Sequence, residues 1–336
     1  MSPRTIVIAG DAAGSHAPQT AEQNGWPLLA EPTSGATNSP NQISAYRYLL
    51  PLLANDKATQ TKPNNIVVFG RPTLNRAVNQ LITNPPQPSR FNIELNSNFL
   101  ELWLAASKIA HEVLTQITQN ELDNLFGPLA AARQIWQAGG QLVIGASNPI
   151  RDIDIITSLA PSPSRVFSNR GVAGIDGTIA TALGIATASG SHTASGNNHI
   201  TRLYLGDLTF LHDASSLLSG YGETRPQLQI IVANDGGGSI FSGLEHGEWA
   251  EQNENRRHAF KRVFTTPQSA SIEQLSAGYG VQYTKVSRLA DLQAALASPN
   301  PHVEVIEVGL NGKNRRLMQQ SLAELLAESL VRAGVL

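Results

Sequence analysis

Short apolar runs alternate with longer amphipathic segments along most of the chain. The runs are rich in Val, Ile and Leu and are bounded by Gly, Asp, Asn or Pro, which is typical of buried strands. We expect such strands at residues 5–9, 26–30, 66–69, 141–144, 165–167, 199–205, 228–233, 282–286 and 303–308. The segments between most of them have the character of helices, among them residues 178–188 and 208–220. This alternation predicts an α/β fold of two doubly wound parallel-sheet domains, a small one followed by a larger one.

A Pro-rich stretch at residues 84–89 interrupts the alternation. After it we expect a short strand at 91–95 and a long amphipathic helix at 100–119. We therefore place the two domains at residues 1–105 and 106–336. Two later segments also break the pattern. We expect a Gly/Ser-rich loop at residues 189–198, and the charged segment 245–262 is interpreted as a solvated helix or loop.

The composition excludes several classes of protein. Of the 336 residues, 41% are hydrophobic and 15% are charged, which is typical of a globular protein with a sizeable core. A net charge of −2 indicates no basic surface for nucleic acid or an anionic membrane. The chain has no Cys, no apolar run near the ~18 residues of a membrane span, and no signal-peptide pattern at its start. We expect a cytoplasmic protein.

Two neighbouring predicted strands end in oxygen-bearing side chains. Asp207 follows the run at 199–205, and Asn234 follows the run at 228–233, 27 positions further on. That spacing accommodates one crossover helix, so both residues are expected at the same edge of adjacent parallel strands, where ligands bind in such sheets. A carboxylate, an amide oxygen and a carbonyl from the following Gly turn suit Mg²⁺, with diphosphate and water completing its coordination. The alternative is an ordinary strand–helix–strand unit with a capping Asp.

Two Arg residues and one Ser are expected beside this edge. Arg151 and Arg170 are predicted at strand ends, where a guanidinium group can hold a carboxylate with two hydrogen bonds. Each could instead pair with a nearby Asp of the chain. Ser147 could donate from its hydroxyl group or cap a helix. The patterns of P-loop, zinc-protease, Ser-hydrolase and Cys/His metal sites do not occur in the sequence.

Three strings of residues now carry a resemblance to a known family. Residues 168–177 (SNRGVAGIDG), 206–213 (GDLTFLHD) and 234–241 (NDGGGSIF) resemble the 2-succinyl-5-enolpyruvyl-6-hydroxy-3-cyclohexene-1-carboxylate synthases of menaquinone biosynthesis, the MenD family. Residues 25–31 and 69–74 resemble the family's central domain, so the resemblance covers essentially the whole chain. Gly206-Asp207 with Asn234-Asp235-Gly236 would alone indicate only a thiamine diphosphate enzyme.

The resemblance implies a reaction and a set of site residues. Enzymes of this family decarboxylate 2-oxoglutarate on thiamine diphosphate and add the succinyl unit to isochorismate. Asp207, the Asn234 side chain and the Gly236 carbonyl would hold Mg²⁺ (or Mn²⁺). Ser147, Arg151 and Arg170 would contact carboxylates of the substrate or intermediate. The implied cofactor-binding residues are Ser147, Gly174, Ile175, Gly206, Asp207, Leu208, Thr209, Asn234, Gly236, Gly237, Ile240 and Phe241.

Two departures from the family pattern affect these expectations. Ser239 resembles a single insertion, which puts the register of Ile240 and Phe241 in question. We also find no equivalent of the family's N-terminal pyrimidine-binding domain, which supplies the Glu that activates the cofactor. We therefore expect a fragment that is inactive alone and that assembles with that domain as a homodimer or tetramer.

Two other interpretations stay open. The chain could belong to another thiamine diphosphate enzyme, such as a 2-oxoacid decarboxylase or a relative of acetolactate synthase. It could also be a non-catalytic binding or regulatory module that retains the two-domain scaffold. The Arg pair favours dicarboxylate chemistry over the first alternative, and the second predicts no Mg²⁺-dependent cofactor binding.

Overall fold

A computed structural model describes residues 4–55, 60–85, 98–189 and 200–336. The chain divides into two units, which we describe separately. Unit 1 consists of Met1–Ile117, Ile153–Ser162 and Ser321–Leu336, and unit 2 of Thr118–Asp152 and Pro163–Gln320. The domain limits of 1–105 and 106–336 remain a prediction.

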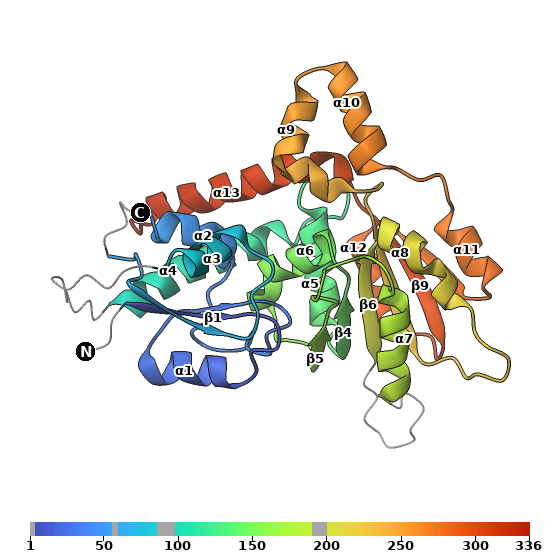
Figure 1. Cartoon of the computed structure of the whole chain (residues 1–336), viewed down its shortest axis with the longest axis horizontal. Helices are drawn as coiled ribbons and strands as arrows, with labels where there is room; N and C mark the ends of the chain where they lie inside the picture. Colours follow the sequence, from blue (N-terminus) through green and yellow to red (C-terminus); the bar gives the residue numbers. More distant parts are fainter. Residues whose placement is uncertain (1–3, 56–59, 86–97, 190–199) are drawn as a thin grey trace. The chain divides into compact units, whose positions relative to one another are not determined.

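Unit 1 contains a three-stranded parallel sheet of order β2-β1-β3. Its strands are β1 (Thr5–Ala9), β2 (Leu28–Ala30) and β3 (Asn65–Phe69). Helix α1 (His16–Asn24) lies on one face, and α2 (Tyr46–Leu53) and α4 (Phe99–Ile117) lie on the other (Figure 1), while α3 (Arg76–Thr83) follows β3. β2 begins after Pro27, whose ring nitrogen has no hydrogen to donate to the ladder.

Hydrogen bonds join the segments 25–31 and 69–74 of unit 1 to each other. The Glu31 carboxylate is 3% exposed and accepts hydrogen bonds from the backbone N–H groups of Thr73 (2.7 Å) and Leu74 (2.8 Å). Gly10 also lies against this loop, where an added Cβ would be 2.1 Å from the nitrogen of Pro72. Gly10 is thus required for packing of the loop.

Unit 2 contains a six-stranded parallel sheet of order β5-β4-β6-β7-β9-β8. Its strands are β4 (Gln141–Ile144), β5 (Arg165–Phe167), β6 (Thr201–Gly206), β7 (Leu228–Asn234), β8 (Gln282–Val286) and β9 (Val303–Gly309). From β4 the chain proceeds to one side for β5 and returns to the other side for β6. The strand order therefore reverses between β4 and β6, and the predicted α/β fold class with two parallel sheets is confirmed.

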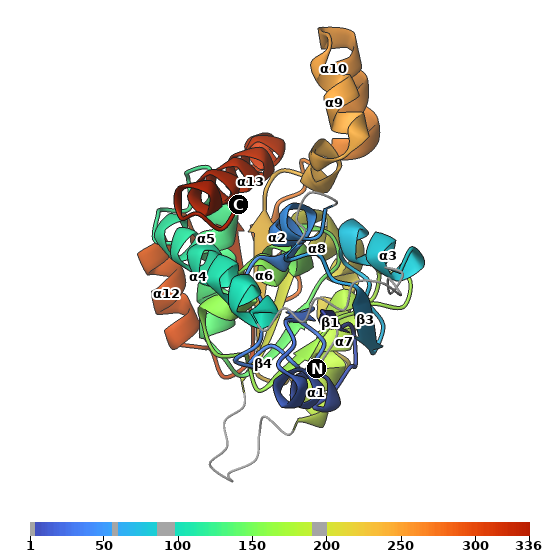
Figure 2. The same ribbon diagram turned by 90° about the vertical axis from the view of Figure 1, so that its left-hand side faces the viewer.

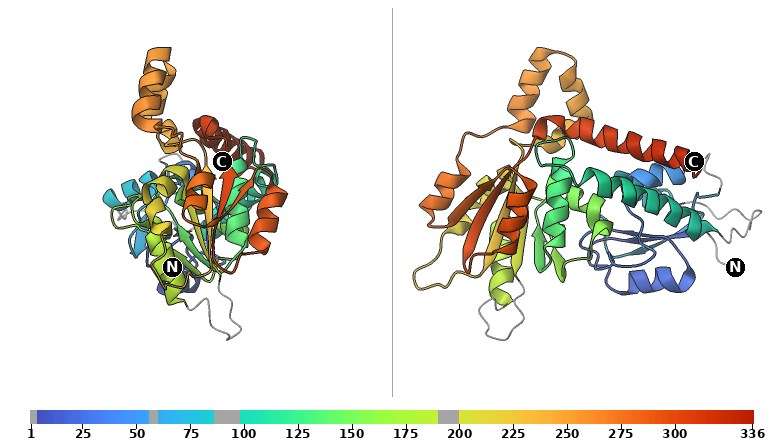
Figure 3. Two further views of the ribbon diagram at one scale, coloured as in Figure 1. Left: turned by 90° about the vertical axis from the view of Figure 1, so that its right-hand side faces the viewer. Right: turned by 180° about the vertical axis from the view of Figure 1, so that it is seen from behind.

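Helices cover both faces of this sheet. α7 (Thr178–Ala188) and α8 (Asp207–Asp213) lie on one side, and α5 (Gly127–Gln137) and α12 (Leu289–Ala297) lie on the other (Figure 3). α11 (Ile272–Gly278) precedes β8, and α13 (Arg315–Arg332) ends the chain. Single turns of 3₁₀ helix lie at Thr157–Leu159 (η1), Ala214–Leu217 (η2), Ser239–Gly243 (η3) and Gly312–Asn314 (η5), and a π-helical turn at Lys261–Thr265 (η4).

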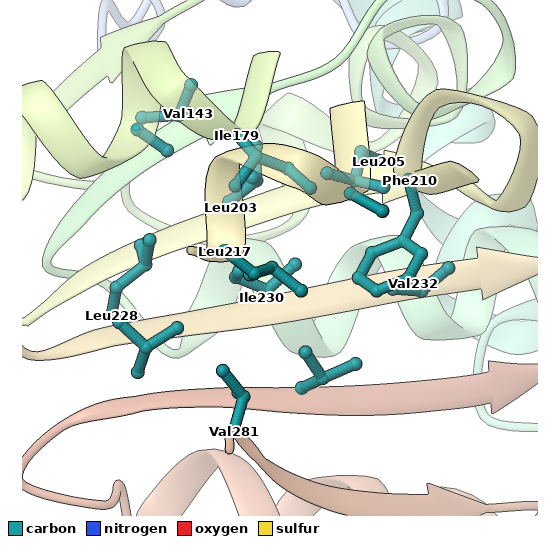
Figure 4. Packing of buried hydrophobic residues seen from close by; sticks show 14 of the residues in the cluster. Val143, Ile179, Leu203, Leu205, Phe210, Leu217, Leu228, Ile230, Val232 and Val281 are labelled. Carbon is teal, nitrogen blue, oxygen red and sulfur yellow. The ribbon is translucent and has the colours of Figure 1, made fainter. Parts of the chain in front are cut away.

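The core of unit 2 explains why its strand sequences are continuously apolar. Leu205 and Val232 of the central strands pack against Ile179 of α7 and Phe210 of α8, and all four are at most 1% exposed (Figure 4). Residues on the opposite sheet face, such as Ile231, are equally buried. Both faces are covered by helices, so the strands lack the polar alternation of a half-exposed sheet.

The structure corrects the sequence prediction in two places. Where the sequence predicts Arg151 at a strand end, α6 (Asn148–Ile156) begins instead, favoured by Pro149 in its first turn. Arg151 therefore lies on a helix. The helix predicted at 208–220 ends at Asp213 and continues only as η2. The charged segment, interpreted as a solvated helix or loop, is helical: α9 (Glu245–Glu251) and α10 (Glu254–Phe260) project from unit 2 as a pair (Figure 2).

Two expectations concern residues outside the described part of the chain. The predicted strand at 91–95 and nearly all of the loop at 189–198 fall there. Among the residues that the structure describes, no helix is both long enough and apolar enough to cross a membrane.

Candidate functional site

The carboxyl ends of β4, β6 and β7 meet at one edge of unit 2, beside the point where the strand order reverses. A cavity of about 300 Å³ lies there. It is lined by most of the residues singled out from the sequence: Ser147, Arg151, Arg170, Ile175, Gly206, Asp207, Leu208, Thr209, Gly237, Ile240 and Phe241. Gly174, Asn234 and Gly236 do not line it. Ligands bind at this position in doubly wound sheets.

The ends of β6 and β7 carry the two predicted metal-binding side chains. Gly206, the last residue of β6, is paired with Ala233 in the parallel ladder. Asp207, the first residue of α8, and Asn234, the last residue of β7, directly follow this pair. The Asn234 side chain is held at both ends. Its Nδ2 donates to Glu307 Oε1 at 3.0 Å, and its Oδ1 accepts from the N–H of Gly236 at 3.2 Å.

Asp207 is a buried carboxylate beside a second acid. It is 8% exposed, and its Oδ1 accepts from the backbone N–H of Leu208 at 2.9 Å. Burial, followed by the charge of Asp235, raises the pKa of Asp207 to about 6, although backbone N–H groups that include Gly237 act in the opposite direction. Without a bound cation, the charged form is thus destabilised. A divalent cation would stabilise it, so this carboxylate, the Asn234 amide and the glycine turn fit an Mg²⁺ site.

The turn after Asn234 requires glycine. Gly236 and Gly237 have φ angles of 83° and 120°, which side chains rarely permit. A Cβ on Gly237 would lie 2.2 Å from the carbonyl oxygen of Thr265. Gly236 is exposed, whereas Gly237 and Gly238 are buried. The backbone therefore turns tightly past the metal-binding candidates and leaves Gly236 open to a ligand.

A buried polar network that lines part of the cavity was not predicted from the sequence. Arg315 is 3% exposed, and its guanidinium group lies 2.6 Å from Asp152 Oδ1 and 3.5 Å from Asp235 Oδ2. Asn148 Nδ2 donates to Ser239 Oγ at 2.7 Å, and Ser239 Oγ in turn donates to Asp235. The additional residue Ser239 is thus bonded into the turn, and Ile240 and Phe241 still line the cavity.

The two Arg side chains predicted near this edge line the cavity from different elements. Arg170 follows β5 and is 6% exposed, whereas Arg151 projects from α6. Arg151 Nη1 donates to the carbonyl oxygen of Ser147 at 2.7 Å. Ser147 itself has a φ of 75°, an unfavourable angle for a residue other than glycine. The hydrogen bond from Arg151 stabilises this strained backbone at the cavity wall.

The donor set differs from that of a carboxylate-rich or thiolate site. In the described ranges, no group of three or more His, Cys, Asp or Glu side chains is arranged to hold a metal ion. The predicted site instead combines one carboxylate, one amide oxygen and one backbone carbonyl. Such a set suits a hard cation that also binds ligand oxygens.

Comparison with known proteins gives the same family as the sequence motifs. No family model matches the chain. Three curated relatives are all named 2-succinyl-5-enolpyruvyl-6-hydroxy-3-cyclohexene-1-carboxylate synthase. The protein of Arthrobacter sp. (strain FB24) is 39% identical over 334 residues, covering 91% of this chain and 54% of the relative. That of Paenarthrobacter aurescens (strain TC1) is 38% identical, covering 96% and 59%. That of Nocardioides sp. (strain ATCC BAA-499 / JS614) is 36% identical, covering 96% and 64%.

The similarity extends over nearly all of this chain but over only part of each relative. The chain spans 54% to 64% of the length of these three proteins. The predicted family resemblance is thus confirmed as a similarity to one part of the synthase.

Proposed function

We propose that this chain, which corresponds in sequence to part of a MenD-type synthase, forms that enzyme's site for Mg²⁺ and the diphosphate of thiamine diphosphate. The enzyme in question decarboxylates 2-oxoglutarate and transfers the succinyl unit to isochorismate. The observation that carries the proposal is the position of Asp207 and Asn234 at the carboxyl ends of adjacent parallel strands, with a turn that requires glycine directly after Asn234.

In this proposal, three groups hold the cation, which is Mg²⁺ or Mn²⁺. They are the Asp207 carboxylate, the Oδ1 of Asn234 and the carbonyl oxygen of Gly236. The raised pKa of Asp207 supports this assignment, because a buried carboxylate of this kind is stabilised by a cation. The open backbone at Gly236 gives diphosphate oxygens access to the same cation. Gly174, Gly206, Leu208, Thr209 and Gly237 are proposed to contact the cofactor.

The rest of the cavity is proposed to receive the substrates. Thiamine diphosphate, when bound, supplies the electron-accepting group for decarboxylation. The chain's own contribution is to orient anionic substrates, through Arg151 and Arg170, in a cavity with apolar walls at Ile175, Ile240 and Phe241. Two guanidinium groups at one small cavity favour a dicarboxylate such as 2-oxoglutarate over a monocarboxylate. Ser147 is proposed to donate a hydrogen bond to a substrate carboxylate.

The other two interpretations make different predictions. A general 2-oxoacid decarboxylase would bind pyruvate as well as 2-oxoglutarate, whereas the two Arg residues predict a preference for 2-oxoglutarate. A regulatory module would bind no cofactor in an Mg²⁺-dependent way. Catalysis is proposed for the synthase as a whole, and this chain alone is proposed to bind the cofactor without turning over substrate.

The test is calorimetric titration of thiamine diphosphate into this chain, with Mg²⁺ or with EDTA. We expect binding with Mg²⁺ that EDTA abolishes and that Asp207→Ala removes. Asp291→Ala is the matched control, because Asp291 is an exposed Asp paired with Arg288 and should leave binding unchanged. Binding that persists in EDTA, or that survives Asp207→Ala, would contradict the proposed site.

A further inference from the structure

Glu307 is a buried acid that the proposed chemistry does not use. It lies on β9, next to β7, and is 5% exposed. A carboxylate at such a position is costly unless hydrogen bonds satisfy its oxygens. Its partners therefore indicate what it does.

Both oxygens of Glu307 are engaged, on one face of three adjacent strands. Oε1 accepts from Asn234 Nδ2 at 3.0 Å and lies 3.5 Å from Lys285 Nζ. Oε2 accepts from the hydroxyl group of Tyr283 at 2.8 Å. In the ladder Glu307 is paired with Val232 of β7 and with Lys285 of β8. Asn234 is two residues beyond Val232 and so projects from the same face. A polar row thus crosses β8, β9 and β7 and ends at the proposed metal ligand.

The carboxylate determines which way the Asn234 amide faces. An amide has a donor end, Nδ2, and an acceptor end, Oδ1, whereas an ionised carboxylate only accepts. With Nδ2 against Glu307, Oδ1 faces the glycine turn, where it accepts from the N–H of Gly236. The flipped amide would set its oxygen against Glu307 Oε1 and direct its NH₂ group toward the cation.

We propose that Glu307 is a positioning residue that fixes the Asn234 amide with Oδ1 directed toward the metal and diphosphate. Tyr283 and Lys285 hold Glu307 in turn. The expected effect on metal affinity rests on the proposed function, whereas the orientation of the Asn234 amide does not. A Gln at position 307 could accept or donate, so it would permit both orientations of Asn234, and the acid enforces one.

A neighbouring acid provides the matched control. Glu304 lies on the same strand and is also 5% exposed, but it accepts from Gln229 (3.0 Å) and from the N–H of Asn300 (2.9 Å), away from Asn234. Glu307→Ala and Glu304→Ala therefore remove equally buried acids from β9. Only the first removes a partner of Asn234.

The first measurement needs neither metal nor cofactor. The side-chain amide protons of Asn234, assigned in NMR spectra by their loss in Asn234→Asp, report the hydrogen bond to Glu307 through their exchange with solvent. We expect slow exchange in the wild type and in Glu304→Ala, and at least tenfold faster exchange in Glu307→Ala. Unchanged exchange in Glu307→Ala would overturn the proposal.

The second measurement is Mn²⁺ affinity in the presence of thiamine diphosphate, followed by electron paramagnetic resonance. Removing an outer partner of a metal ligand weakens affinity by roughly 10- to 100-fold. We expect about a tenfold loss in Glu307→Ala, a smaller loss in Glu307→Gln, and no change in Glu304→Ala. Equal losses in both Ala variants would overturn the proposal and indicate a structural role. If the wild type does not bind Mn²⁺, the proposed function fails, while the exchange measurement still decides the orientation.

Tyr283→Phe keeps the test decisive if Glu307→Ala does not fold. It removes one hydrogen bond to Glu307 without opening a large cavity. We expect faster exchange of the Asn234 amide protons and a two- to fivefold weaker Mn²⁺ affinity. If the exchange rate and the Mn²⁺ affinity both equal those of the wild type, the proposal that Tyr283 holds Glu307 against Asn234 is overturned.

Discussion

At the scale of single residues, Asp207 shows how a binding site can oppose stability. Its carboxyl group is buried near Asp235, and its pKa is raised from 3.8 to about 6. The folded chain therefore binds the proton more tightly than the unfolded chain. Ionisation costs stability above about pH 6, and the cost vanishes below about pH 4, where the group is protonated in both states.

Replacing Asp207 by Asn should remove this cost. Without metal or cofactor, we expect Asp207→Asn to be more stable than the wild type by about 3 kcal/mol at pH 7.5, since one pKa unit corresponds to ~1.4 kcal/mol and the pKa is raised from 3.8 to about 6. At pH 3 the two proteins should be nearly equally stable, because the carboxyl group is then mostly protonated in both states. Urea unfolding in EDTA at both pH values measures the difference. A variant that is less stable than the wild type at pH 7.5 would contradict the assigned burial of the charge.

The positions of single residues could be predicted where their neighbours in the sequence determine them. Asp207 and Asn234 each follow an apolar run directly, so their position at strand ends could be deduced from neighbouring residues. Arg315 could not be found in this way, because its partner Asp152 lies 163 positions away. Glu307 is likewise 73 positions from Asn234. Such partners are set by strand order and packing, which neighbouring residues do not encode.

At the scale of elements, α7 is capped from outside its own sequence. Its N-cap position is Gly177, in the left-handed region with φ 61°, and has no side chain to cap the helix. Asp213, at the end of α8, accepts from the N–H groups of Ile179 (2.6 Å) and Ala180 (3.1 Å). A negative charge also suits a helix N-terminus. The sequence predicted α7 with its observed bounds, but not this cap.

Asp213→Ala should therefore loosen the start of α7 and the loop that carries Ile175. We expect a loss of about 1–2 kcal/mol in unfolding free energy, as for other lost caps, and weaker binding of thiamine diphosphate. Asp213→Asn, which retains an acceptor oxygen, should recover most of both. Chemical unfolding and calorimetry measure the two effects. Wild-type stability in Asp213→Ala would show that the cap contributes little.

At the scale of the whole molecule, the alternation of apolar and amphipathic segments was sufficient to predict two parallel sheets. It could not give the order β5-β4-β6-β7-β9-β8, because order depends on where each crossover helix packs. It also missed α6, whose start at Asn148 looked like a strand-end loop. The strand-order reversal between β4 and β6 nevertheless lies where the predicted residues gather.

Cofactor binding should change the dynamics of unit 2 selectively. With Mg²⁺ and thiamine diphosphate, we expect slower hydrogen exchange in the segments around Ser147, Ile175, Asp207 and residues 234–241. Strands β1, β2 and β3 of unit 1 should exchange at unchanged rates. Mass spectrometry of exchanged peptides, with and without EDTA, measures both. Slowing confined to unit 1 would contradict the assigned site.

The most direct test of the central claim is anomalous diffraction from crystals of this chain grown with Mn²⁺ and thiamine diphosphate. We expect one Mn²⁺ peak within about 2.0–2.6 Å, the range of hard-cation-to-oxygen distances, of a carboxylate oxygen of Asp207, Oδ1 of Asn234 and the carbonyl oxygen of Gly236. Diphosphate density should lie next to it. Cofactor density with Mn²⁺ bound elsewhere, or with no Mn²⁺ at the ends of β6 and β7, would contradict the account.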